Sequence, residues 1–217
     1  MGRWTGERWA AAAGIAFVVL SVVGDALPGA SYPKISDDPA TIAAYIRDHH
    51  RALGAGAILT GAGAPLLVWL FAGLAGRLRD AGQGAFAIVV LSAVVAGTAL
   101  ATASDAVLQA TTRISDHDGL TKAAYATSGF LITKAFWFAA VAAFAIGLAG
   151  RRGALPSWYA SLALAAGVSF CLGGLTVRED GFFAVAGPMT LIAFVTLMVW
   201  ALTTSVVLWR VPRATPG

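Results

Sequence analysis

Three ionisable residues, Asp25, Asp105 and Lys134, lie within long apolar stretches of this sequence, where charged side chains are rare. An ionisable group at membrane depth is costly unless it has a partner or a wet cavity, so such groups usually serve a function. A carboxyl group in an apolar pocket can stay protonated and act as a general acid. Asp105 and Asp25 are therefore the candidate catalytic residues.

Lys134 is the expected partner of Asp25. At 1.5 Å per helical residue, each of the two lies about 22 Å from the cytoplasmic end of its own helix, and the two helices run in opposite directions. Such a pair would hold Asp25 ionised and leave Asp105 as the better acid. It could also be a purely structural link, and Lys134 could instead extend to the membrane surface.

Other side chains are placed to complete a pocket around the carboxyl groups. Polar residues form one stripe at helical spacing along the segment of Asp105, and two aromatic residues lie one turn from Lys134. Aromatic faces stabilise a positive charge that develops during a reaction. The expected substrate-binding residues are Lys134, Trp137, Phe138, Thr102, Gln109 and His49.

The composition indicates which elements position these residues. Of the 217 residues, 58% are hydrophobic and 12% are charged, whereas soluble domains carry about 25% charged residues. Spanning a bilayer takes about 20 apolar helical residues. We therefore predict an all-α, polytopic membrane helix bundle that forms one domain over residues 1–217. Its six predicted spans are residues 10–27, 52–75, 85–108, 130–149, 158–177 and 183–209.

The first span could instead be a cleaved signal peptide. Arg3 and Arg8 form a basic leader region, and Gly24-Asp25-Ala26 has the small residues of a cleavage site. Its length and the Pro28 that follows favour a retained helix.

The distribution of basic residues predicts the orientation. With the N-terminus in the cytoplasm, eight Lys and Arg residues face inward and six face outward, and the basic turns Arg77/Arg79 and Arg151/Arg152 adjoin helix ends. We expect a multi-pass protein of a bacterial cell membrane with both termini in the cytoplasm. The basic residues are not gathered on one face, so nucleic acid is not an expected partner.

The longest predicted outer loop precedes the second span. Asp38 suits a helix N-cap and Pro39 the first helical position. Apolar and aromatic residues then recur at helical spacing, which predicts a short surface helix over about residues 38–51 that runs into the span. His49 lies on its apolar face and is expected to cap the pocket.

Histidines and carboxylates occur together in two outer segments, 48–50 and 116–118. Imidazole and carboxylate are zinc ligands, but neither segment has the two-His spacing of a helical metal site. Cys171 is the one cysteine, so the chain has no internal disulfide. We assign no metal and no cofactor.

Two short segments carry a resemblance to known proteins: Asp38-Pro-Ala-Thr-Ile-Ala-Ala-Tyr-Ile, and Leu155-Pro-Ser-Trp-Tyr. The chain resembles uncharacterised six-helix integral membrane proteins of actinobacteria and other bacteria, a resemblance that implies a fold and no activity. In size and in its outward carboxyl groups it is also similar to small integral-membrane terpene cyclases, in architecture alone.

Three functions remain open at this point. The first is an integral membrane enzyme that acts by general-acid chemistry, such as terpene cyclisation or isomerisation, on a lipid-soluble substrate, such as an isoprenoid, in an outward-facing pocket. The second is a proton-coupled carrier of small molecules. The third is a non-catalytic membrane partner that docks another protein through the segment 38–51. The oligomeric state is left open.

Overall fold

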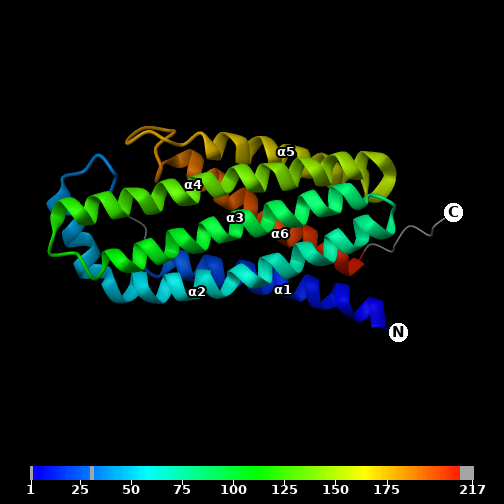
Figure 1. Cartoon of the computed structure of the whole chain (residues 1–217), viewed down its shortest axis with the longest axis horizontal. Helices are drawn as coiled ribbons and strands as arrows, with labels where there is room; N and C mark the ends of the chain where they lie inside the picture. Colours follow the sequence, from blue (N-terminus) through cyan, green and yellow to red (C-terminus); the bar gives the residue numbers. More distant parts are fainter. Residues whose placement is uncertain (1, 30–31, 211–217) are drawn as a thin grey trace.

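The computed structural model describes residues 2–29 and 32–210, with side chains from Gly6 onward. The described residues form six long helices, all of them long and apolar enough to cross a membrane (Figure 1). The predicted all-α six-helix bundle is therefore confirmed. The elements are α1 (Gly2–Ala26), α2 (Pro39–Asp80), α3 (Gly84–Thr111), α4 (Asp118–Ala149), the short π-helical turn η1 (Gly150–Ala154), α5 (Ser157–Gly174) and α6 (Pro188–Arg210).

The helices form a closed ring. Each one packs against the next along the chain, α6 packs against α1, and α2 also contacts α4 and α6 across the centre. α1 begins and α6 ends at one end of the bundle, which we call the terminal end (Figure 1). The connecting residues 27–29, 32–38, 112–117 and 175–187 lie at the opposite end, the loop end. α1 is thus an integral wall of the bundle, because without it the facing sides of α2 and α6 would be uncovered.

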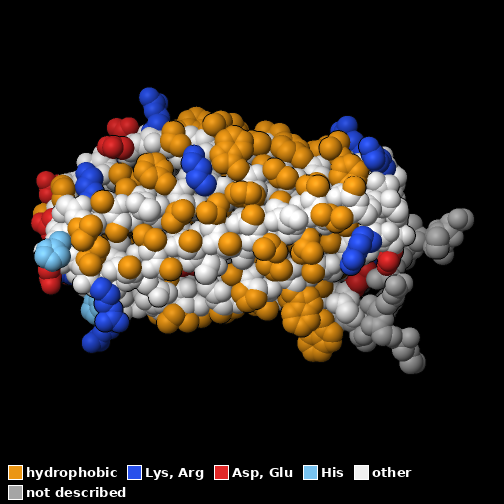
Figure 2. Space-filling model, in the orientation of Figure 1, with side chains coloured by type: hydrophobic (Ala, Val, Ile, Leu, Met, Phe, Trp, Pro, Cys, Tyr) orange, Lys and Arg blue, Asp and Glu red, His pale blue; other side chains and the backbone are white. Residues whose placement is uncertain are grey.

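The surface has the pattern expected of a protein surrounded by lipid. Hydrophobic side chains cover the middle of the molecule, and charged side chains gather mainly at its two ends (Figure 2). Large apolar side chains such as Trp69, Ile88 and Leu191 are more than half exposed. Exposing such a continuous apolar belt to water would be unfavourable, so the belt is expected to face lipid and the chain is a multi-pass membrane protein.

The predicted surface helix is continuous with the second span. α2 has 42 residues, a length of about 63 Å at 1.5 Å per residue, so it projects well beyond a hydrocarbon core of about 30 Å. Its start follows the expected pattern, since the Asp38 carboxylate accepts a hydrogen bond from the Ala40 N–H at 2.9 Å. The helix continues because Ile42, Ile46 and Leu53 form one buried face across the predicted junction.

Among the other boundaries, the starts of α4 and α6 differ from those of the predicted spans. α4 begins at Asp118, three turns before residue 130, because Thr121 and Tyr125 are buried against the loop end of the bundle. α6 begins at Pro188 and not at residue 183. The preceding residues form a turn in which the Arg178 N–H donates to the Phe183 carbonyl and the Val185 N–H donates to the Arg178 carbonyl, each at 3.2 Å.

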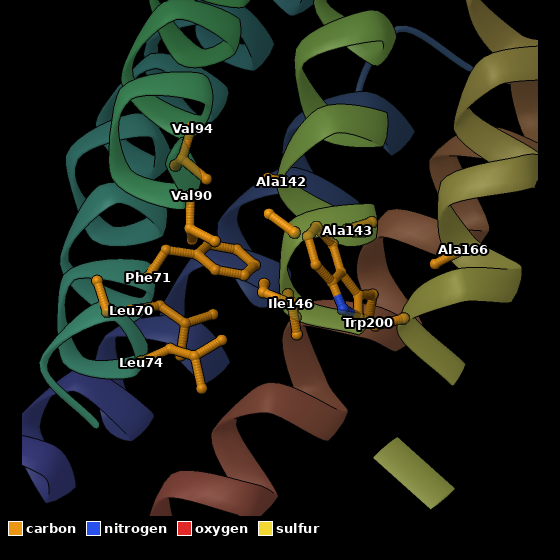
Figure 3. Packing of buried hydrophobic residues seen from close by; sticks show 14 of the residues in the cluster. Leu70, Phe71, Leu74, Val90, Val94, Ala142, Ala143, Ile146, Ala166 and Trp200 are labelled. Atoms are coloured by element: carbon orange, nitrogen blue, oxygen red, sulfur yellow. The ribbon is translucent and has the colours of Figure 1, made fainter. Parts of the chain in front are cut away.

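The terminal half of the bundle is a close-packed apolar core (Figure 3). The Trp200 ring lies 4.7 Å from that of Phe71 and 5.5 Å from that of Phe170. The Trp200 Nε1–H has no hydrogen-bond acceptor among the described residues. Its neighbour Tyr159 is fully buried and hydrogen bonded to Thr204 at 2.6 Å. This core closes the centre of the bundle towards the terminal end.

A buried ion pair lies at the terminal end of the core. Arg77 Nη2 lies 3.1 Å from Glu7 Oε2, with both side chains at most 9% exposed, and Arg77 Nη1 donates to the Val207 carbonyl at 3.1 Å. The guanidinium therefore joins α1, α2 and α6. The sequence predicted a basic turn at Arg77, whereas α2 continues past this residue to Asp80.

Candidate functional site

A cavity of about 200 Å³ lies inside the helix ring, between the terminal core and the loop end. α1, α2, α3, α4 and α6 line it, and α5 does not. Its deep part has aromatic walls made by Phe17, Phe71, Phe136 and Trp200. Apart from the six polar residues described next, most of the other lining residues are alanine or branched aliphatic residues, so this part of the cavity suits an apolar molecule.

Polar side chains gather at the loop-end part of this cavity, which we call the polar end. They are Ser21, Asp25, Thr60, Thr98, Thr102 and Asp105. The Thr60 hydroxyl donates a hydrogen bond to Asp105 Oδ2 at 2.8 Å. The two carboxyl groups are close enough to interact electrostatically. Asp25 is exposed and Asp105 half-buried, so the polar end is the accessible part of the cavity.

A close helix crossing holds the polar end together. A Cβ atom added to Gly56 would lie 2.5 Å from the carbonyl oxygen of Gly24, and one added to Gly24 would lie 2.9 Å from that of Gly56. Small residues allow membrane helices to approach this closely. Because Asp25 follows Gly24 and Thr60 lies one turn from Gly56, the crossing brings Asp25 beside the Thr60–Asp105 pair.

Lys134 does not form the expected ion pair with Asp25. Its ammonium group donates to the Gly174 carbonyl at 3.4 Å, and Trp137 Nε1 donates to the same oxygen at 3.1 Å. Gly174 ends α5, where carbonyl groups lack helical partners and cations are favoured. Both side chains therefore face α5 and lie outside the cavity lining.

The other predicted binding residues divide into two groups. Thr102 lines the cavity beside Asp105, as the polar stripe indicated. Gln109 is exposed and Phe138 is 37% exposed, and neither lines the cavity. The four aromatic residues of the deep part went unrecognised in the sequence, because aromatic residues in apolar helices look alike until the helix rotations are known.

His49 belongs to an aromatic stack at the loop end. Its ring lies 4.3 Å from that of Tyr45, and its Nδ1 lies 3.0 Å from the Tyr45 carbonyl. The Tyr45 ring lies 5.9 Å from that of Tyr32. Burial raises the pKa of the Tyr32 hydroxyl, and the nearby Asp25 carboxylate raises it further. Tyr32 is thus the member of the stack beside the polar end, while His49 lies outside the cavity lining.

The segment 32–38, which precedes α2, is held at the loop end by contacts with α2 and α4. Tyr125 donates to the Pro33 carbonyl and Lys122 to the Asp37 carbonyl, each at 2.9 Å. Ile35 is buried in the apolar cluster formed with α2 and α4. These contacts hold Tyr32 near the cavity.

The two histidine-containing segments lie beside each other at the loop end. Arg47 lies between them, donating to the Ser115 carbonyl at 2.7 Å and pairing with Asp118 at 3.9 Å. Within the described part of the chain, no three His, Cys, Asp or Glu side chains are grouped so that they could hold a metal ion.

No protein-family model, curated protein or solved structure matches this chain. The chemistry of the site therefore has to be argued from its geometry.

Proposed function

We propose that this protein is an integral membrane enzyme that isomerises or cyclises a small lipid-soluble substrate, such as an isoprenoid, by general-acid catalysis. The observation that carries the proposal is the pair Asp25 and Asp105 at one end of an otherwise apolar cavity. Two nearby carboxyl groups in a low-dielectric site do not both ionise readily, so they tend to share one proton. Such a pair supplies an acid and an anion in the same place.

The hydrogen bonds favour a division of roles. The Thr60 hydroxyl donates to Asp105, and a donated hydrogen bond stabilises the ionised form of a carboxyl group. Asp25 has no cationic partner among the described residues, since Lys134 is bonded to Gly174. We therefore assign the proton to Asp25 and the negative charge to Asp105, the reverse of the order inferred from an Asp25–Lys134 pair.

The reaction conserves the atoms of the substrate. The Asp25 carboxyl group transfers its proton to an alkene carbon or an epoxide oxygen, which leaves a positive charge on a substrate carbon. Ionised Asp105 and the aromatic walls stabilise that charge while a new carbon–carbon bond or double bond forms. Loss of a proton from an adjacent carbon to the Asp25 carboxylate regenerates the acid.

The packing of the bundle argues against a carrier. A carrier needs a route from its site to both sides of the membrane. Here the aromatic core around Trp200 and the buried Glu7–Arg77 pair fill the terminal half. A partner-docking role for α2 would not require the carboxyl pair.

The test is mass spectrometry of lipid extracts from cells that express the wild type or single variants and are supplied with prenylated and epoxidised precursors. We expect a product from the wild type and from the exposed control Asp116→Asn, and none from Asp25→Asn. If Asp25→Asn is present in the membrane and forms product normally, the proposed acid is wrong.

A further inference from the structure

We infer that the polar end of the cavity binds the cationic head group of a small amphiphilic amine or ammonium compound whose apolar chain occupies the cavity. The inference rests on the proposed function, because it concerns the same carboxyl pair. It goes further in naming a class of ligand that binds without reacting.

The first support is an uncompensated negative charge. Asp25 and Asp105 line the cavity together, and within the described part of the chain neither forms an ion pair. Lys134, which the sequence predicted to lie at the same membrane depth as Asp25, donates instead to the Gly174 carbonyl at the end of α5. A carboxylate within a membrane is energetically costly when no cation lies beside it. A cationic ligand would supply that partner, so the electrostatic attraction would contribute to its binding.

The second support is the aromatic surface beside the carboxyl groups. Tyr32 lies close enough to Asp25 and Asp105 to interact with both electrostatically, and its ring packs at 5.9 Å from that of Tyr45. Aromatic faces next to carboxylates attract alkylated ammonium groups. A strongly hydrated inorganic cation would gain little from these faces.

The third support is the shape and lining of the rest of the cavity. Beyond the polar end, Phe17, Phe71 and Phe136 line a space that belongs to a cavity of about 200 Å³. That volume holds about seven methyl-sized groups at the ~30 Å³ that one water molecule takes in the liquid. A chain of about six carbons attached to an ammonium head would fill it, with the head at the accessible polar end.

The experiment measures equilibrium binding of radiolabelled hexyltrimethylammonium to the full chain in lipid nanodiscs, with empty nanodiscs as the blank. We expect saturable binding of one molecule per chain. Binding should weaken about thirtyfold or more in Asp105→Asn, because this variant removes the carboxyl group that carries the negative charge. Asp25→Asn should weaken binding less, because Asp25 holds the shared proton. The Asp116→Asn control should bind like the wild type.

A competition experiment on the wild-type protein does not depend on the folding of any variant. Unlabelled hexyltrimethylammonium should displace the label, whereas hexanol, which has the same chain without the charge, should not do so at equal concentration. Equal displacement by hexanol would overturn the inference, and so would displacement by Na⁺ or Ca²⁺ as effective as that by the alkylammonium ion. Unchanged affinity in both aspartate variants would overturn it as well.

The result of this binding experiment can be distinguished from the result of the test of the proposed function. Carboxylate-dependent binding of the cation with no product in the lipid extracts would uphold the binding site and reject the chemistry. A product that depends on Asp25, formed by a protein that does not bind the cation, would reject this inference and leave the enzyme in place.

Discussion

At the scale of single residues, Thr60 determines how the two carboxyl groups differ. Its hydroxyl also lies 3.2 Å from the Gly56 carbonyl of its own helix, so the backbone of α2 fixes its position. Asp105 receives its hydrogen bond from this fixed hydroxyl, whereas no hydrogen bond to Asp25 is seen among the described residues. One threonine thereby makes two identical side chains unequal.

The first prediction concerns this hydroxyl. Thr60→Val keeps the shape of the side chain and removes the donor, and a hydrogen bond to a charged group contributes about 1.5–3 kcal/mol. We expect the rate of product formation to fall about tenfold or more. Thr60→Ser retains the hydroxyl and should retain the rate. Equal rates in Thr60→Val and the wild type would contradict the assigned division of roles.

At the scale of the helices, the contact between α1 and α2 positions the site, and the same contact suggests a test with neighbouring glycines. Gly56→Ala adds a methyl group 2.5 Å from the Gly24 carbonyl, whereas a methyl group on Gly54 meets nothing within 4 Å. Overpacking of this kind costs about 1–3 kcal/mol, while alanine in an open helical position gains up to about 1 kcal/mol over glycine.

We therefore expect Gly56→Ala to lower the thermal unfolding temperature in detergent and to weaken binding of hexyltrimethylammonium, because α1 and Asp25 move away from Thr60. Gly54→Ala should bind the cation like the wild type and unfold at the same temperature or slightly higher. If the two variants behave alike, the close crossing does not hold the polar end together.

The Glu7–Arg77 ion pair is a second contact that holds helices together, and it lies at the terminal end. Removing one partner of a buried pair leaves an uncompensated charge and costs about 3–5 kcal/mol. Glu7→Ala should therefore unfold at a clearly lower temperature, whereas Arg79→Gln, at an exposed position of the same helix as Arg77, should not. A wild-type unfolding temperature for Glu7→Ala would show that the pair is not needed to join α1, α2 and α6.

At the scale of the whole molecule, the orientation in the membrane remains a prediction from the basic residues. It can be tested by labelling single cysteines in a Cys171→Ala background with a reagent that does not cross the membrane. Ser36→Cys and Asp180→Cys lie at the loop end and should react from outside the cell. Arg152→Cys lies at the terminal end and should react only after the membrane is opened. Reversed labelling would place the polar end on the cytoplasmic side.

The sequence predicted the fold well and the site in part, for physical reasons. The length of an apolar segment and the scarcity of charges within it are local properties, so the six spans could be predicted directly from the sequence. The helical spacing of the polar residues likewise placed Thr102 with Asp105. The hydrogen-bond partner of Lys134 could not be predicted from the sequence. It depends on the rotation of α4 about its axis and on the Gly174 carbonyl, which lies at the end of α5. The cavity walls could not be predicted either, since Phe136 lines the cavity and the adjacent Trp137 does not.

The central claim is that Asp25 and Asp105 act as one unit, and a double-variant comparison of product formation tests it most directly. Rates would be measured for Asp25→Asn, Asp105→Asn and the double variant in the same membranes. If the pair shares one function, each single variant should lose nearly all activity and the double variant should be no worse than the poorer single one. Normal turnover in either single variant, or losses that multiply in the double variant, would contradict a shared carboxyl pair.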